Sequence, residues 1–125
     1  LGHEELARMT QIDYDREMAF VAVGQDGPYN QQILGVVRAI SNPDQSDAEF
    51  AILVRSDLKG LGLGKLMMEK IVRYARERGI GQLSGMTMPS NRGMINLAKR
   101  LGFQIDIQLE DGIVNMVLPC VDQGR

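Results

Sequence analysis

The sequence predicts one α/β domain built on a mixed β-sheet, and three observations support this fold class. The chain has 125 residues, enough for one domain and too few for two. Its middle alternates apolar runs with helical periodicities in the order strand, helix, strand, helix, which requires parallel neighbouring strands. Both outer parts read as antiparallel hairpins. We therefore expect hairpins at the two ends of the sheet and helical crossovers around its middle.

The first half of the chain contains three predicted strands. Apolar residues in Glu4–Ile12 have a weak helical spacing, which also fits a loosely packed terminus. The runs Met18–Val23 and Ile33–Ile40 are separated by turn residues and predict a hairpin. Glu49–Val54 predicts a third strand, apolar enough to be buried on both faces and therefore central.

The second half switches to a period of 3.6 residues. A helical stripe begins at Leu63 and ends at Gly79, and a second stripe runs from Met94 to Leu101. Between and after them, the sequence predicts the strands Gln82–Met88, Phe103–Leu109 and Ile113–Leu118. Asp111-Gly112 is the strongest hairpin signal in the chain.

Composition excludes several classes of protein. Hydrophobic residues make up 44% and charged residues 24%, which is typical of a folded globular core. The net charge of −2 provides no overall field for nucleic acid or anionic lipid, so we expect neither as a partner. The longest apolar run, Met18–Val23, is far shorter than the roughly 20 residues of a membrane helix. Without a signal peptide either, we expect a soluble cytoplasmic protein.

Cys120 and His3 are the only cysteine and histidine of the chain. This excludes internal disulfides, metal sites built from several His or Cys residues, and a Ser/His/Asp apparatus. Chemistry must therefore use carboxylates, hydroxyls, lysines or main-chain amides. Because the sequence begins with leucine, we expect residues 1–125 to be one domain taken from a longer protein.

A glycine-rich turn is the most informative segment. It lies between a predicted strand and a predicted helix and reads Lys59, Gly60, Leu61, Gly62, Leu63, Gly64, Lys65. The amides at a helix N-terminus attract phosphate, and glycines let it approach closely. The spacing matches neither a Rossmann fingerprint nor a P-loop. The alternative is that these glycines only make a tight turn and close packing.

The turn resembles the Gln/Arg-x-x-Gly-x-Gly/Ala motif of the GCN5-related N-acetyltransferase (GNAT) family. Asn91 to Phe103 resembles the later family motif, which begins with Asn and ends in Leu-Gly-Phe. The resemblance covers Met18 to Leu118. It implies a three-layer fold with a centrally splayed mixed sheet flanked by helices. The family's first strand has no counterpart in this sequence, which agrees with a truncated N-terminus.

A narrower resemblance is carried by Thr10–Phe20 and Glu49–Gly64. These segments are similar to the C-terminal acetyltransferase domain of bacterial protein lysine acetyltransferases, where it follows a region like an NDP-forming acyl-CoA synthetase. This implies acetyl transfer from acetyl-CoA to a lysine of a protein, and the implied partner is an acyl-CoA synthetase. A small-amine acetyltransferase and a non-catalytic acyl-CoA sensor remain alternatives. The acceptor, the acyl-chain preference and the oligomeric state are not readable from the sequence.

The family resemblance also implies the cofactor-binding residues. The amides of Gly60 to Lys65 would hold the pyrophosphate of coenzyme A. Leu53 and Val54 would pair with pantetheine through their main chain, and an amide near Val54 would stabilise the oxyanion. Asn91 would bond pantetheine through its side chain. Lys59 departs mildly from the family motif, because Gln or Arg is usual there.

The reaction requires a neutral amine, so a protonated lysine needs a base. Glu49, which begins the central strand, is the predicted base. Partial burial raises the pKa of a carboxyl group toward the working pH range. Asp47, Asp106 and Glu110 are weaker candidates, and Glu49 could also be solvated and inert. Ala98 stands where many family members carry the tyrosine acid, although a thiolate can leave without one. No metal or redox cofactor is expected.

Overall fold

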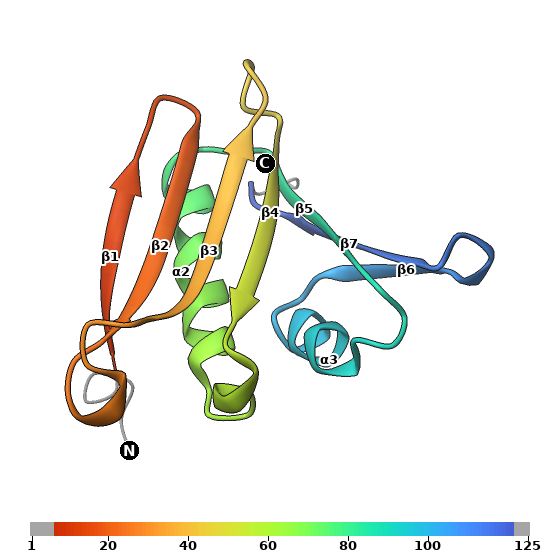
Figure 1. Cartoon of the computed structure of the whole chain (residues 1–125). Helices are drawn as coiled ribbons and strands as arrows, with labels where there is room; N and C mark the ends of the chain where they lie inside the picture. The colour runs from red at the N-terminus through yellow and green to blue at the C-terminus, as the bar shows by residue number, and fades with distance from the viewer. Residues whose placement is uncertain (1–6, 122–125) are drawn as a thin grey trace.

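The computed structural model describes residues 7–121 as a seven-stranded sheet with two α-helices (Figure 1). The strands follow one another across the sheet in the order β1-β2-β3-β4-β5-β7-β6. Their bounds are β1 Ala7–Asp13, β2 Glu17–Gly24, β3 Ile33–Ser41, β4 Asp47–Val54, β5 Gln82–Thr87, β6 Gln104–Gln108 and β7 Ile113–Pro119, and the helices are α2 Leu63–Glu77 and α3 Arg92–Arg100. The predicted mixed α/β fold class is confirmed.

The pairing of the strands follows the predicted plan. β1 to β4 form an antiparallel meander, and β7 pairs antiparallel with both β5 and β6. The parallel contact is between β4 and β5, which α2 connects. The crossover through α3 joins β5 to β6. These two strands do not pair with each other, because β7 lies between them.

Strand β1 corrects the prediction for the N-terminal segment. Ala7–Asp13 pairs with β2 along its whole length, so the helical spacing read in Glu4–Ile12 was misleading. Most β1 side chains are exposed, so the strand is held mainly by main-chain hydrogen bonds to β2, which no local periodicity reveals. Residues 4–6 lie outside the described residues, and the expected loss of a strand upstream of Leu1 stays a prediction.

One face of the sheet carries the core. Phe20, Val37 and Phe50 lie on this face of β2, β3 and β4, and all are buried. On the other face, β4 exposes Glu49 and Leu53, so the prediction that this strand is buried on both faces was wrong. The physical reason is that both helices of the described part pack on the same face. Residues 7–121 therefore form two layers instead of a sheet flanked by helices on both sides.

Both helices pack on this buried face through the predicted apolar stripes. Met67, Ile71 and Ala75 of α2 are fully buried. Ala98 of α3 is also fully buried, and Phe103, just after α3, packs on Phe50 with ring centroids 5.6 Å apart. The aromatic pair connects the two halves of the core. None of the helices within residues 7–121 is long and apolar enough to cross a membrane.

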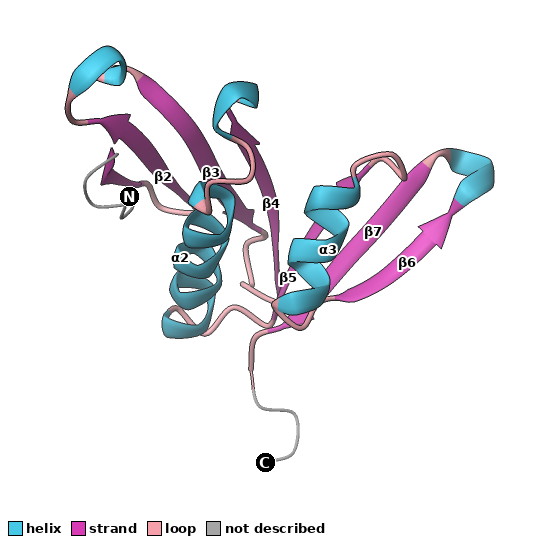
Figure 2. Ribbon diagram, turned by 90° about the horizontal axis from the view of Figure 1, so that it is seen from below, coloured by secondary structure: helices cyan, strands magenta, loops and turns pink. Residues whose placement is uncertain are grey.

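The centre of the sheet is splayed, as the family resemblance implied. β4 and β5 pair only through Asp47–Glu49 and the facing residues of β5. Beyond that point the two strands diverge, and Figure 2 shows the halves of the sheet opening away from each other. From Phe50 to Val54, the side of β4 that faces β5 therefore has no partner strand. We call this gap between β4 and β5 the sheet opening.

Candidate active site

The glycine turn Lys59–Lys65 leads directly into α2 at the end of β4. Gly60 and Gly62 both have φ of 88°, which a residue with a side chain rarely adopts. The first helical hydrogen bond runs from the N–H of Leu66 to the C=O of Gly62, and within residues 7–121 no main-chain acceptor is found for the amides of Gly62 to Lys65. These donors lie at the positive end of the helix dipole and form a site for an anion.

Gly64 distinguishes an anion site from a purely structural turn. It lies in the first turn of α2, and a Cβ there would meet only Leu97, at an ordinary 3.8 Å. Packing against the sheet therefore does not require glycine at this position. A small residue at this position leaves the helix amides open to a ligand.

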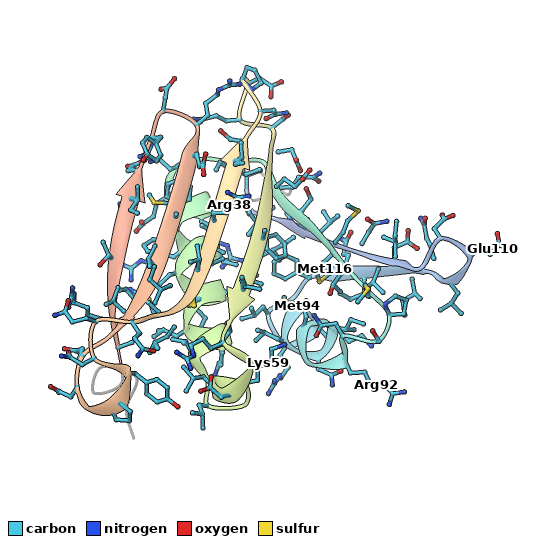
Figure 3. All side chains as sticks on the ribbon, viewed as in Figure 1. Arg38, Lys59, Arg92, Met94, Glu110 and Met116 are labelled. Atoms are coloured by element: carbon cyan, nitrogen blue, oxygen red, sulfur yellow. The ribbon has the colours of Figure 1, made fainter. Side chains whose placement is uncertain are left out.

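Two lysines flank the glycine turn in the sequence, and one arginine lies at the same end of the molecule (Figure 3). Lys59 and Lys65 are exposed, and so is Arg92 at the start of α3. No ion pair of these three side chains is found in the described part of the chain. Figure 3 shows Lys59 and Arg92 at the same end of the molecule, on two different elements. The sequence prediction missed Arg92, because only the fold brings the start of α3 to the end of the sheet where α2 begins.

The register of β4 decides which of its main-chain groups face the sheet opening. The N–H of Arg55 donates to the C=O of Leu34 at 2.9 Å, and the β3–β4 register is regular. Hydrogen-bonded pairs alternate along an antiparallel ladder, so Leu53 bonds to β3. Ile52 and Val54 instead direct their N–H and C=O groups toward the sheet opening. The main chain of Val54 therefore faces the sheet opening, as the expected contact with pantetheine requires. The main chain of Leu53 faces β3, so Ile52 is better placed than Leu53 for the second contact.

Glu49 lies on the helix-free face, at the last paired position before β4 and β5 diverge. It is exposed, so the expected partial burial is not found, because no helix covers this face in the described residues. A hollow of about 350 Å³ opens beside it. The lining residues of this acidic hollow are Arg38, Ile40, Ser41, Asn42, Asp47, Glu49, Phe50 and Ala51.

The alternative carboxylates are less well placed than Glu49. Asp47 also lines the acidic hollow, but its carboxylate accepts hydrogen bonds from Gln82 Nε2 at 3.0 Å and Ser84 Oγ at 3.2 Å. Asp106 lies on β6 and accepts a hydrogen bond from Gln108. Glu110 lies at the tip of the β6–β7 hairpin, far from β4 (Figure 3). Glu49 lies where β4 and β5 diverge, and its carboxylate oxygens have no hydrogen-bond partner within residues 7–121. It is therefore the best-placed of these carboxylates to accept a proton.

Asn91 has a structural role that the sequence did not reveal. Its Oδ1 accepts a hydrogen bond from the N–H of Met94 at 3.1 Å and so caps α3. Its Nδ2 donates to Thr87 Oγ1 at 3.0 Å, which ties the helix to the end of β5. One N–H of the amide remains available for a ligand. Asn91 is thus positioned by the fold before any ligand binds.

We expect Asn91→Ala to lower the free energy of unfolding by about 1 kcal/mol, because the N-terminus of α3 loses its cap. Asn91→Asp keeps an oxygen that can accept from Met94 N–H and should retain most of this stability. Urea denaturation of both variants measures the difference. Equal stability of Asn91→Ala and the wild type would contradict the capping role.

The usual acid of the family is absent from its position. Ala98 is fully buried on α3, and the three tyrosines lie on other elements, at Tyr14, Tyr29 and Tyr74. Cys120 does not replace it, because burial raises the pKa of its thiol and its Sγ donates to the C=O of Leu118. Among residues 7–121, no group of three or more His, Cys, Asp or Glu side chains could hold a metal ion.

The fold and the site together define a class of protein. The splayed sheet presents the free edge of β4, and the N-terminus of α2, which can bind phosphate, lies at the end of that edge. The carboxylate of Glu49 lies on the face of the sheet that the helices do not cover. This arrangement can bind a phosphorylated, extended ligand, because the helix N-terminus accepts the phosphate and the free strand edge accepts the extended part. The sequence model of the acetyltransferase (GNAT) family matches residues 2–103, so the chain belongs to this family, whose members use acetyl-CoA as cosubstrate.

Curated relatives agree with this assignment. Acetyltransferase PA5475 of Pseudomonas aeruginosa is 33% identical over 99 residues, which cover 78% of this chain and 52% of that protein. Histone acetyltransferase TAP1 of Glycine max is 29% identical over 83 residues, covering 66% of this chain and 35% of that protein. The chain thus spans about half or less of the length of these relatives.

Solved structures share the fold. The GNAT domain of S. lividans PAT superimposes with a TM-score of 0.71 at 24% identity, covering 86% of this chain and 64% of that one. Campylobacter jejuni N-acetyltransferase PseH, in complex with acetyl coenzyme A, gives a TM-score of 0.66 at 22% identity, covering 86% of this chain and 71% of that one. At these identities the likeness supports the fold.

Proposed function

We propose that this domain transfers the acetyl group of acetyl-CoA to the ε-amine of a lysine in a protein substrate. The observation that carries the proposal is the sheet opening, with a helix N-terminus for phosphate at its end and Glu49 on the opposite face. The thioester would lie in the opening, between the anion site and the carboxylate. The acceptor amine would approach from the helix-free face, through the acidic hollow.

The residues present fit the cosubstrate. The amides of Gly60 to Lys65 would hold its pyrophosphate, with Lys59, Lys65 and Arg92 balancing the phosphate charge. The main-chain groups of Ile52 and Val54 would pair with pantetheine as an added strand does. The free N–H of Asn91 would donate to it. Bound acetyl-CoA supplies an activated thioester carbonyl.

Chemistry then depends on a proton transfer. Lysine is protonated at neutral pH, so Glu49, directly or through water, would accept a proton from the acceptor ammonium. The neutral amine attacks the carbonyl carbon, and an amide of Ile52 or Val54 donates to the oxyanion. The C–S bond then breaks, and the nitrogen releases its remaining extra proton to solvent. A thiol like that of cysteine has a pKa near 8.5, so the coenzyme can leave as a thiolate without a tyrosine to protonate it.

A protein acceptor is favoured by three observations. Thr10–Phe20 and Glu49–Gly64 resemble bacterial protein lysine acetyltransferases, and one relative is named a histone acetyltransferase. Exposed apolar side chains lie on the same face as the acidic hollow, including Ile40, Leu53 and Met86. Such contacts suit a folded partner better than a small polar amine. We further propose an acyl-CoA synthetase as the partner and the cytoplasm as the location.

Two alternatives have specific support. One relative is named L-methionine sulfoximine/L-methionine sulfone acetyltransferase and is 33% identical over 61 residues, which favours a small amine. The buried Ala98, in place of the usual acid, favours a domain that binds acetyl-CoA without turnover.

The test is to incubate the domain and acetyl-CoA with a purified acyl-CoA synthetase, and separately with a panel of small amines. We expect release of free thiol together with a lysine of the synthetase heavier by one acetyl group, detected by mass spectrometry. Acetylated small amines without modified protein would reject the protein acceptor. Binding of acetyl-CoA without any thiol release would favour the sensor.

A further inference from the structure

Arg55 links the glycine turn to a distant hairpin. It follows β4 directly, and four residues separate it from Gly60. Its Nε and Nη2 bond the two oxygens of Asp57, each at 3.1 Å, and its Nη1 bonds Gln32 Oε1 at 2.6 Å. Its guanidinium also lies over the ring of Tyr29, 5.2 Å from the centroid. One side chain thus joins the chain before the glycine turn to the β2–β3 hairpin.

The other members of this cluster are also held in place. Tyr29 donates its hydroxyl to Asp57 Oδ2 at 3.2 Å, which closes a ring of contacts with Arg55. Gln32 Nε2 donates to the C=O of Pro28 at 3.3 Å. The hydrogen bond from Arg55 lowers the pKa of Asp57, because it stabilises the charged carboxylate. We call Tyr29, Gln32, Arg55 and Asp57 the Arg55 cluster.

Few other contacts hold the glycine turn. The N–H of Leu58 donates to the C=O of Arg55 at 3.0 Å, and the N–H of Leu61 donates to the C=O of Leu58 at 3.4 Å. Between Arg55 and Gly62, Leu58 is the one residue whose side chain is buried. Gly60 has only open space around the position of a Cβ. The segment would therefore sample many conformations if it were held only at Leu58 and at its two ends, and its amides would lose their common direction.

We infer that Arg55 is a positioning residue, which orients the glycine turn for the phosphates of acetyl-CoA by fixing its first residues to the β2–β3 hairpin. This inference rests on the proposed function of the glycine turn. Arg55 acts without touching the ligand, and its effect passes through Asp57 and the following turn. Exposed ion pairs contribute little to stability, so the effect should appear in binding rather than in folding.

The inference is tested with Arg55→Lys in the full chain. Lysine keeps the charge but cannot form the two-pronged contact with Asp57 or stack in the same way on Tyr29. We expect the Kd for acetyl-CoA, measured by calorimetry, to rise about tenfold, with KM for acetyl-CoA rising in parallel. We expect kcat at saturating acetyl-CoA and the thermal midpoint of unfolding to stay near wild-type values. Tyr29→Phe, which keeps the ring and loses one hydrogen bond, should show a smaller rise.

Arg73→Lys is the matched control. Arg73 forms an exposed ion pair with Glu77 on α2, with a distance of 3.3 Å, so the same substitution removes a similar contact away from the turn. Its Kd should not change. An unchanged Kd in Arg55→Lys, or a fall in kcat alone, would overturn the positioning role while leaving the proposed function intact. Failure of the wild-type domain to bind acetyl-CoA would instead reject the proposed function, and the inference with it.

Discussion

Glu49→Gln is expected to lower turnover by roughly 10²- to 10⁴-fold, the usual contribution of a general base. Glutamine has nearly the same shape and cannot accept the proton of the acceptor ammonium. Because Glu49 lies on the helix-free face and the anion site lies at the end of the sheet opening, acetyl-CoA affinity should stay unchanged. Initial rates of thiol release and calorimetry of acetyl-CoA binding measure the two quantities separately.

Glu110→Gln is the matched control for this substitution. Glu110 lies at the tip of the β6–β7 hairpin, so the same chemical change is expected to leave turnover at the wild-type rate. Asp47→Asn tests the neighbouring carboxylate of the acidic hollow. A wild-type rate in Glu49→Gln together with a large loss in Asp47→Asn would transfer the role of base to Asp47.

Gly64→Leu is expected to weaken acetyl-CoA binding about 100-fold or more while leaving the fold intact. A leucine side chain in the first turn of α2 would prevent a phosphate from reaching the free amides, and each hydrogen bond to a charged group contributes about 1.5 to 3 kcal/mol. A Cβ at this position meets only Leu97, at 3.8 Å, and urea denaturation shows whether the longer leucine side chain also leaves the protein folded. Gly62 is a poorer choice for the test, since its φ of 88° would add backbone strain to any substitution.

Gly64→Ala is the control variant. The family motif admits alanine at this position, so affinity should remain near the wild-type value, and the unfolding free energy should rise by up to about 1 kcal/mol because alanine favours the helix. Calorimetry with acetyl-CoA and urea denaturation of both variants provide the data. A folded Gly64→Leu protein with undiminished affinity would reject the glycine turn as the phosphate site.

Much of this protein was predictable from local sequence patterns. The stripes that begin at Leu63 and Met94 form α2 and α3, because helical periodicity depends only on residues three and four positions apart. The hairpins and the position of the central strand were also correct, but the predicted burial of that strand on both faces was wrong. The glycine turn was identified from its glycines between a predicted strand and a predicted helix and from its resemblance to a family motif. The structure gives Gly60 and Gly62 positive φ angles and leaves the amides of Gly62 to Lys65 without main-chain acceptors within residues 7–121.

Features that depend on pairing partners required the tertiary structure. β1 is a strand because the edge of β2 pairs with it, although its own sequence suggested a helix. The choice of Ile52 over Leu53 at the sheet opening depends on the register between β3 and β4, and a shift by one residue would reverse it. The exposure of Glu49 depends on which face the helices cover.

Side-chain contacts between distant segments also could not be predicted from the sequence. Arg55 meets Gln32 across 23 positions of the chain, and Tyr29 meets Asp57 across 28. Asn91 was recognised by its family motif, but its cap on α3 and its bond to Thr87 were visible only in three dimensions. Local periodicity determines which elements form, because it acts between near neighbours. The placement of charged and polar groups in the site depends on how strands pair and turns pack, which only the folded chain decides.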